Sequence, residues 1–275
     1  VRLLKGVANL ITIAFVTAKI SKLEIERRNL EKNLELTGQV QSLLLPHKNN
    51  FESEEFSLVG HYQPAEQSGG DWWFFERLHN GSPVIVVGDV TGHGAGPAMV
   101  TAIVAGIFQC LTDQLDSTSD LSDVCRTLNQ RLVEICQGHY WMTLALVHYS
   151  PETGKIRLWS AGAPPVLIHR ENGKVEAAFA TGSLLGAIDS EFEVGFVEKD
   201  LKPGERVLIA TDGVFELETP DGQLGMRRTM RIMQSVSEEP SIILAHEKFL
   251  TNLETARSGV PLKDDLSYVL LERIK

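Results

Sequence analysis

The sequence is poor in cysteine and in basic residues, and both shortages exclude classes of protein. Its 275 residues include three cysteines (Cys110, Cys125 and Cys136), an odd number with no Cys-x-x-Cys pair. A disulfide framework or a zinc site is therefore not expected, and a reducing, cytoplasmic setting fits. The 26 lysines and arginines against 36 acids give a net charge of −10. This balance argues against a nucleic-acid partner, which needs a basic surface.

The apolar stretch near the start of the sequence is short. The apolar stretch at residues 10–20 contains Thr12 and Thr17 and is shorter than the roughly 20 residues that span a bilayer. We therefore predict no membrane segment in this fragment, and no signal peptide is visible. A P-loop is excluded because no Gly-Lys-Ser/Thr sequence occurs. Since Val1 already lies inside a helical pattern, we expect the chain to be part of a longer protein.

Residues 1–45 predict one long helix. They contain no proline, and apolar residues recur at helical spacing among charged ones. The apolar stripe consists of Ile20, Leu23, Leu30, Leu34 and Val40. A stripe of this length predicts a parallel coiled-coil homodimer, and the alternative is a helix folded back on the domain that follows. Pro46 is expected to end the helix, because the residue before proline disfavours helical geometry.

From residue 51 onward, short β-type runs alternate with turn signals. Runs of strands with pairs of helices between them predict an α+β fold with antiparallel sheets. The predicted helices are residues 96–114, 121–136, 226–235 and 241–255. The predicted strands are residues 56–62, 72–78, 83–90, 141–149, 156–160, 166–169, 192–197, 206–210 and 265–271.

Five acidic residues stand where apolar, strand-like runs begin or end, beside glycine or a second acid. They are Asp71, Asp89, Asp212, Asp264 and Asp265. Carboxylates that converge repel one another and lose hydration unless a cation neutralises them. Ligand sets made only of oxygen suit Mg²⁺ and Mn²⁺. The pattern by itself therefore predicts a two-metal hydrolase.

Four motifs carry these acids in a fixed order. They are Gly69-Gly70-Asp71-Trp72-Trp73, Gly88-Asp89-Val90-Thr91-Gly92-His93-Gly94, Thr211-Asp212-Gly213-Val214 and Asp264-Asp265-Leu266-Ser267. In this order and spacing the motifs resemble the metal-dependent (type 2C-like) protein phosphatases, and most of all their bacterial SpoIIE/RsbU-like branch. The resemblance implies an antiparallel β-sandwich flanked by helix pairs, in αββα layers, with two Mn²⁺ or Mg²⁺ ions at one end.

The resemblance also implies a role for each acid. Asp71, Asp89, Asp212 and Asp264 would be the catalytic metal ligands, with Asp89 bridging the two ions. The carbonyl oxygen of Val90 would be a further metal ligand. Asp265 would stand beside this set, as an additional ligand or as its support. Such a metal pair lowers the pKa of a bridging water and stabilises charge on the transferred phosphoryl group.

Organisation and partners follow from the same resemblance. Residues 1–18 are similar to the last helix of a GAF-type sensor domain, 19–48 to a coiled-coil linker and 49–275 to the phosphatase domain. The implied activity is hydrolysis of phosphoserine or phosphothreonine on a partner protein, a STAS-type anti-anti-sigma factor in a partner-switching pathway. Two alternatives stay open: a catalytically weak binding module that regulates a partner by docking, and a phosphatase for a small metabolite.

Several positions depart from the family pattern or leave a choice. Many relatives have an acid where this chain has Phe74, so we expect either a weaker second metal site or a core phenylalanine. His93 lies four residues after Asp89, and we expect it to order its loop rather than to act as a general acid. No arginine stands where the eukaryotic relatives grip phosphate. Of Trp72 and Trp73, we expect one in the core and one at the rim.

Overall fold

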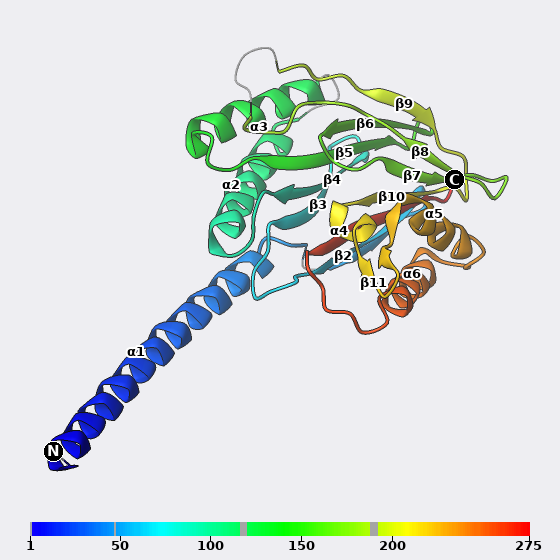
Figure 1. Cartoon of the computed structure of the whole chain (residues 1–275). Helices are drawn as coiled ribbons and strands as arrows, with labels where there is room; N and C mark the ends of the chain where they lie inside the picture. Colours follow the sequence, from blue (N-terminus) through cyan, green and yellow to red (C-terminus); the bar gives the residue numbers. More distant parts are fainter. Residues whose placement is uncertain (1, 47, 116–119, 188–191) are drawn as a thin grey trace.

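Two antiparallel sheets packed face to face form the centre of the molecule, and a helix pair covers each outer face (Figure 1). This computed structural model describes residues 2–46, 48–115, 120–187 and 192–275. The predicted α+β fold with αββα layers is confirmed.

The first sheet has the strand order β1-β2-β13-β10-β7-β8, and the second has the order β3-β4-β5-β6-β9. The strands of the first sheet are β1 (Asn50–Glu52), β2 (Phe56–Gln63), β13 (Leu266–Arg273), β10 (Arg206–Ala210), β7 (Val166–His169) and β8 (Val175–Ala178). The strands of the second sheet are β3 (Asp71–Arg77), β4 (Pro83–Val90), β5 (Met142–Ser150), β6 (Lys155–Ala161) and β9 (Val197–Asp200).

Each helix pair lies on one sheet. α2 (Ala95–Thr112) and α3 (Leu121–Cys136) cover the second sheet, and α5 (Gly225–Ser235) and α6 (Ile242–Arg257) cover the first. Between β10 and α5 come the single turn α4 (Asp212–Phe215) and the small hairpin of β11 (Glu218–Thr219) and β12 (Gly222–Gln223). α2 is long and apolar enough to cross a membrane by length and composition, but Val104 and Phe108 on it are buried against the second sheet.

The central strands are apolar on both faces because both faces of each sheet are covered. In β4, Val84 and Val86 face α2 and α3, whereas Ile85 and Val87 face the other sheet. The two neighbouring tryptophans of β3 follow the same alternation, and both side chains are buried. The expectation of one core and one rim tryptophan was therefore wrong, since successive strand residues here enter two different apolar layers.

Most predicted elements agree with the structure to within two or three residues, but the strand predicted at 192–197 was wrong. Residues 192–196 are irregular, and β9 covers Val197–Asp200 instead. Phe192, Val194 and Phe196 still pack against the core beneath α3. Their alternation therefore reflects the packing of an extended loop. The short elements β1, β8, β11, β12 and α4 were not predicted.

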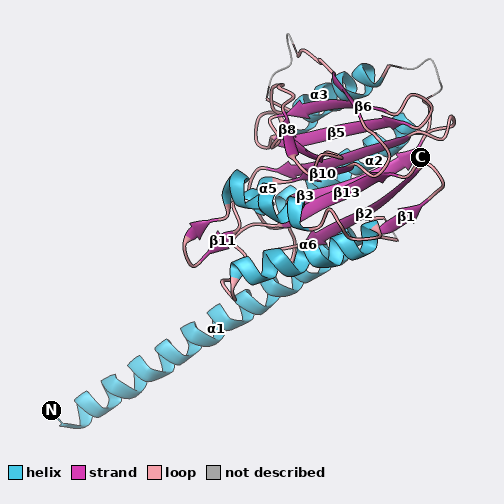
Figure 2. Cartoon of the chain, turned by 90° about the vertical axis from the view of Figure 1, so that its right-hand side faces the viewer, coloured by secondary structure: helices cyan, strands magenta, loops and turns pink. Residues whose placement is uncertain are grey.

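The predicted N-terminal helix is one continuous α-helix, α1 (Arg2–Ser42), which projects from the sandwich (Figures 1 and 2). The side chains of Ile20 and Leu23 are 51% and 55% exposed, so this stretch is not folded back on the domain. Near its C-terminal end the helix meets the domain through Gly38 and Gln41. The coiled-coil pairing stays a prediction, and the side chain of Leu30 lies outside the described part of the chain.

Candidate metal centre

The five acids predicted from the sequence lie at one end of the sandwich. Asp71 and Asp89 are direct neighbours, because they oppose each other in the antiparallel pair of β3 and β4. Alternation along these strands puts both residues on the face that looks toward the first sheet, as it does for Trp73 and Val87.

The remaining acids come from the first sheet at the same end. Asp212 begins α4 directly after β10, and Asp264 and Asp265 directly precede β13, the neighbour of β10. The backbone N–H of Thr211 donates to the carbonyl of Ser267 at 3.0 Å, which extends the pairing of these strands to the acids.

Hydrogen bonds join the two sheets at this end. The hydroxyl of Thr211 donates to Oδ2 of Asp71 at 2.8 Å. Asp265 accepts the backbone N–H of Ala65 on Oδ1 at 2.8 Å and that of Asp71 on Oδ2 at 3.3 Å. Asp265 is buried, and both of its carboxylate oxygens are engaged by backbone. It therefore holds the loop that carries Asp71, which fits the supporting role better than that of a ligand.

Three glycines allow the loops to approach this closely. A Cβ atom on Gly69 would overlap the carboxylate of Asp265, and one on Gly213 would overlap its backbone carbonyl. A Cβ atom on Gly70 would overlap the carbonyl oxygen of Val90 and lie 2.7 Å from Oδ1 of Asp89. No side chain fits at these three positions, so glycine is required there. The three glycines form a narrow cradle between the carboxylates and the Val90 carbonyl.

Burial and the charges of neighbouring acids raise the pKa values of Asp71, Asp89 and Asp212. Burial, together with the charges of Asp212, Asp264 and Asp265, raises the pKa of Asp89 to about 8. Burial, and then the charges of Asp89 and Asp265, raises the pKa of Asp71 well above its usual range. Burial, and then Asp264 and Glu216, raises the pKa of Asp212. A divalent cation would remove this electrostatic cost, because it favours the ionised form of every acid around it.

The donor chemistry fits hard divalent cations, although the side chains are not arranged as a finished coordination shell. Within the described residues, no three side chains of His, Cys, Asp or Glu are grouped as they would be around a metal ion. The carboxylates instead meet in neighbouring pairs, Asp71 with Asp89 and Asp212 with Asp264. Oxygen-only donors with the Val90 carbonyl beside them are the set that Mg²⁺ and Mn²⁺ prefer.

Gln41 of α1 is a residue of this site that the sequence reasoning missed. It is only 3% exposed, and its Nε2 donates to the carbonyls of Gly69 at 2.9 Å and Asp71 at 3.2 Å. Its Oε1 accepts the backbone N–H of Gly69 at 3.2 Å and the hydroxyl of Tyr62 at 3.3 Å. The sequence held a signal, because a polar residue at this position interrupts the apolar seam of the helix. The long helix is thus bonded to the loop that carries Asp71.

The structure also decides the open question about Phe74. It lies on the face of β3 opposite to Asp71, with its ring 6.0 Å from that of Trp72 and 6.3 Å from that of Phe108 on α2. Phe74 is therefore a partly buried residue that packs against the core and does not face the carboxylates. His93 is an exposed loop residue, and its Nδ1 lies 3.7 Å from Oε2 of Glu66.

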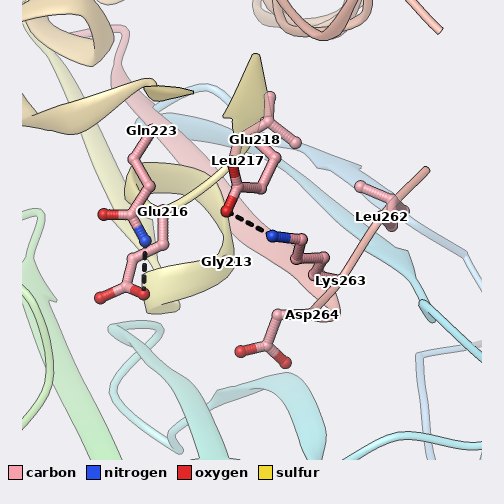
Figure 3. Close-up of a pocket in the computed structure, with 8 residues that line it drawn as sticks. All are labelled: Gly213, Glu216, Leu217, Glu218, Gln223, Leu262, Lys263 and Asp264. Atoms are coloured by element: carbon pink, nitrogen blue, oxygen red, sulfur yellow. Dashed lines mark hydrogen bonds and ion pairs between the residues drawn. The ribbon is translucent and has the colours of Figure 1, made fainter. Parts of the chain in front are cut away.

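A small pocket of about 130 Å³ opens beside Asp264 (Figure 3). In it, Nζ of Lys263 is paired with Oε1 of Glu218 at 2.8 Å, and Nε2 of Gln223 donates to Oε2 of Glu216 at 3.2 Å. The lining residues are Gly213, Glu216, Leu217, Glu218, Gln223, Leu262, Lys263 and Asp264. The rim of the site on this side is thus mainly acidic.

A two-sheet sandwich with carboxylates gathered at one end is the fold of the PP2C-type phosphatases. The SiaA-PP2C domain of Pseudomonas aeruginosa superimposes with a TM-score of 0.75 at 18% identity, covering 91% of this chain and 99% of that domain. Residues 79–274, more than half of the chain, match the family model of stage II sporulation protein E (SpoIIE). The chain therefore belongs to the SpoIIE family and has the PP2C phosphatase fold.

A curated protein and a second solved structure are also similar to the chain. Phosphoserine phosphatase RsbP of Bacillus subtilis (strain 168) is 23% identical over 251 residues, which cover 89% of this chain and 58% of RsbP. The chain thus spans little more than half the length of that relative. The catalytic domain of the serine/threonine phosphatase PstP, solved in complex with two manganese ions, has a TM-score of 0.61 at 11% identity. That match covers 80% of this chain and 99% of the PstP domain.

Proposed function

We propose that this chain hydrolyses phosphoserine or phosphothreonine on a partner protein, with two Mn²⁺ or Mg²⁺ ions as cofactors. The observation that supports this most strongly is that two carboxylate pairs, Asp71 with Asp89 and Asp212 with Asp264, lie at the same end of the two sheets, beside glycines that leave no room for a side chain. The SpoIIE family membership and the two manganese ions of PstP support the same conclusion.

We assign the four carboxylates and the carbonyl of Val90 as the groups that would hold the ions. Asp89 would be central among them, because it lies opposite Asp71 and the charges of Asp212 and Asp264 raise its pKa. When bound, the ions would supply an activated water and stabilise charge on the phosphoryl group. The chain's own groups fix the geometry. Thr211 orients the carboxylate of Asp71, and Asp265 and Gln41 hold its backbone.

We further propose that the partner is a phosphorylated STAS-type anti-anti-sigma factor and that the protein acts in the cytoplasm as a homodimer through α1. The name of RsbP, a phosphoserine phosphatase, supports the class of substrate. The exposed apolar side chains of α1 support the dimer. The alternative of a catalytically weak docking module rested on Phe74, and it loses that support because Phe74 packs against Phe108 on the face away from the carboxylates.

The test is hydrolysis of p-nitrophenyl phosphate with Mn²⁺, with Mg²⁺ and with a chelator. We expect turnover that requires the added metal. Asp89→Asn should abolish it, and Asp123→Asn, which changes an exposed acid on α3, should not. If the wild-type protein shows no turnover with either metal, the docking module becomes the better explanation.

A further inference from the structure

Trp141 is an exposed aromatic residue that continues the strand pairing of the metal centre. It directly precedes β5, and its carbonyl accepts the backbone N–H of Thr91 at 2.9 Å. Its own N–H donates to the hydroxyl of Thr91 at 3.2 Å. Thr91 is two residues after Asp89, so these bonds fix Trp141 at the edge of the site. Its residue surface is nevertheless 43% exposed.

The register shows which face Trp141 occupies. Thr143 opposes Asp89 in the pairing of β4 and β5, and Ala145 opposes Val87, which faces the other sheet. Since side chains alternate along a strand, Trp141 shares this face and lies diagonal to Asp89. Diagonal neighbours in a sheet are roughly 7–8 Å apart.

Leu184 lies next to β5, on the edge of the strand that faces away from β4. Met142 and Leu185 form an isolated antiparallel bridge, with each N–H donating to the other carbonyl at 3.0 Å. One step along this pairing, Leu184 comes beside Thr143, and it is half-buried. Leu185 enters the core beneath α3, so its neighbour Leu184 faces the opposite way. Trp141 and Leu184 together form what we term the apolar shelf.

Leu184 lies over Gly162, whereas the ring of Trp141 has no stacking partner, neither an aromatic ring nor a cation, among the described residues. The rings of Trp72 and Phe74 on β3, by contrast, both pack against Phe108. The groups on the other side of the centre are acidic, with Asp264 and Glu216 lining the small pocket. The mouth of the site is therefore apolar along one edge and acidic along another.

We propose that the apolar shelf is a specificity site, which receives an apolar side chain of the phosphoprotein close to its phosphorylated residue. The proposal rests on the phosphatase function above. The shelf is continuous with the metal centre through the bonds between Trp141 and Thr91, so a polypeptide whose phosphate reaches the carboxylates from this edge passes beside Trp141. An extended chain advances about 3.3–3.6 Å per residue, so the apolar side chain would lie two or three residues from the phosphoserine. Tryptophan is among the residues that most often dominate binding at protein interfaces.

The experiment compares a small substrate with peptides. The probes are p-nitrophenyl phosphate and a set of alanine-rich phosphoserine peptides, each with one leucine at a position from −4 to +4. The enzymes are the wild type, Trp141→Ala, Trp141→Phe and the control Leu244→Ala. Leu244 is also 43% exposed, but it lies on α6 near the opposite end of the sandwich. Thermal unfolding and light scattering are recorded for each.

We expect the wild type to favour leucine at one position, with kcat/KM raised roughly tenfold over the alanine peptide, as a buried apolar contact can provide. Trp141→Ala should abolish this preference through KM and leave turnover of p-nitrophenyl phosphate within about twofold. Trp141→Phe should keep most of the preference, and Leu244→Ala all of it.

Other outcomes overturn the inference in separable ways. A wild type without metal-dependent turnover of p-nitrophenyl phosphate refutes the phosphatase function itself. A wild type that hydrolyses every peptide equally, or a Trp141→Ala variant that loses both substrates in parallel, refutes the apolar shelf alone. A change from dimer to monomer on Trp141→Ala would mean that a second copy of the chain covers Trp141, which also refutes it.

Discussion

Replacing Gln41 by alanine should weaken metal-dependent catalysis from a position on the projecting helix. The change removes both hydrogen bonds to Gly69 and the one to the carbonyl of Asp71, and it leaves these backbone groups buried. Each buried group without a partner costs roughly 1–3 kcal/mol unless water enters. Partners that orient metal ligands are typically worth about 10–100-fold in metal affinity or activity. We therefore expect the Mn²⁺ concentration for half-maximal activity to rise by about this factor.

The assay is a Mn²⁺ titration of p-nitrophenyl phosphate hydrolysis, with calorimetric binding and thermal unfolding of the same samples. Gln39→Ala is the matched control, because this residue is exposed two positions earlier on the same helix. A melting temperature lowered by several degrees with an unchanged Mn²⁺ dependence would refute the reasoning. Gln41 would then attach the helix to the domain without positioning Asp71.

Three further predictions follow from residues described above. Burial and neighbouring charges raise the pKa of Asp89 to about 8 from an ordinary value of 3.8, so the folded metal-free protein binds this proton more tightly than the unfolded chain does. Thermal unfolding without metal should therefore show stability that falls as pH rises from about 4 to 8, and Asp89→Asn should flatten this slope. Phe74→Asp should cost up to about 3 kcal/mol, the low end for a buried aromatic because Phe74 is only partly buried, without tighter Mn²⁺ binding by calorimetry. A tighter Kd would instead mean that position 74 faces the metals. Light scattering should show a dimer for the whole chain and a monomer for residues 49–275, since burying each apolar side chain of α1 is worth about 1.5–3 kcal/mol. A monomeric whole chain at tens of micromolar would contradict the coiled coil.

The layers and the position of the acids could be predicted because their signals are local. Asp89 ends an apolar run and is followed by a glycine-rich turn, so a strand end was readable before any contact was known. The orientation of Phe74 was also available. An offset of three positions along a strand puts a residue on the opposite face from Asp71. A comparison of motifs alone leaves both roles of Phe74 open, because only the strand period separates the two faces.

Other features depend on contacts that no local pattern contains. Gln41 meets Gly69 across 28 positions of sequence, and its role exists only because α1 docks on that loop. Thr211 was seen as part of a motif, but its bond to Asp71 joins two sheets and spans 140 positions. Residues 192–196 alternate like a strand because they pack on the core from one side, and alternation alone cannot show whether a ladder partner exists.

The continuity of α1 gives the molecule a defined rotational phase. A helix of 41 residues is roughly 60 Å long and turns about 100° per residue. The hydrogen bonds of Gln41 fix the rotation of the C-terminal end of α1 relative to the Asp71 loop. Any segment joined to the N-terminal end of α1 is therefore held at a set angle around the helix axis. Inserting one residue on the N-terminal side of Leu34 would turn that segment by about 100° around the helix axis. Inserting seven residues would almost restore its direction and would displace it by about 10 Å along the axis. The helix thus sets both the distance and the direction from which a signal can reach the metal centre.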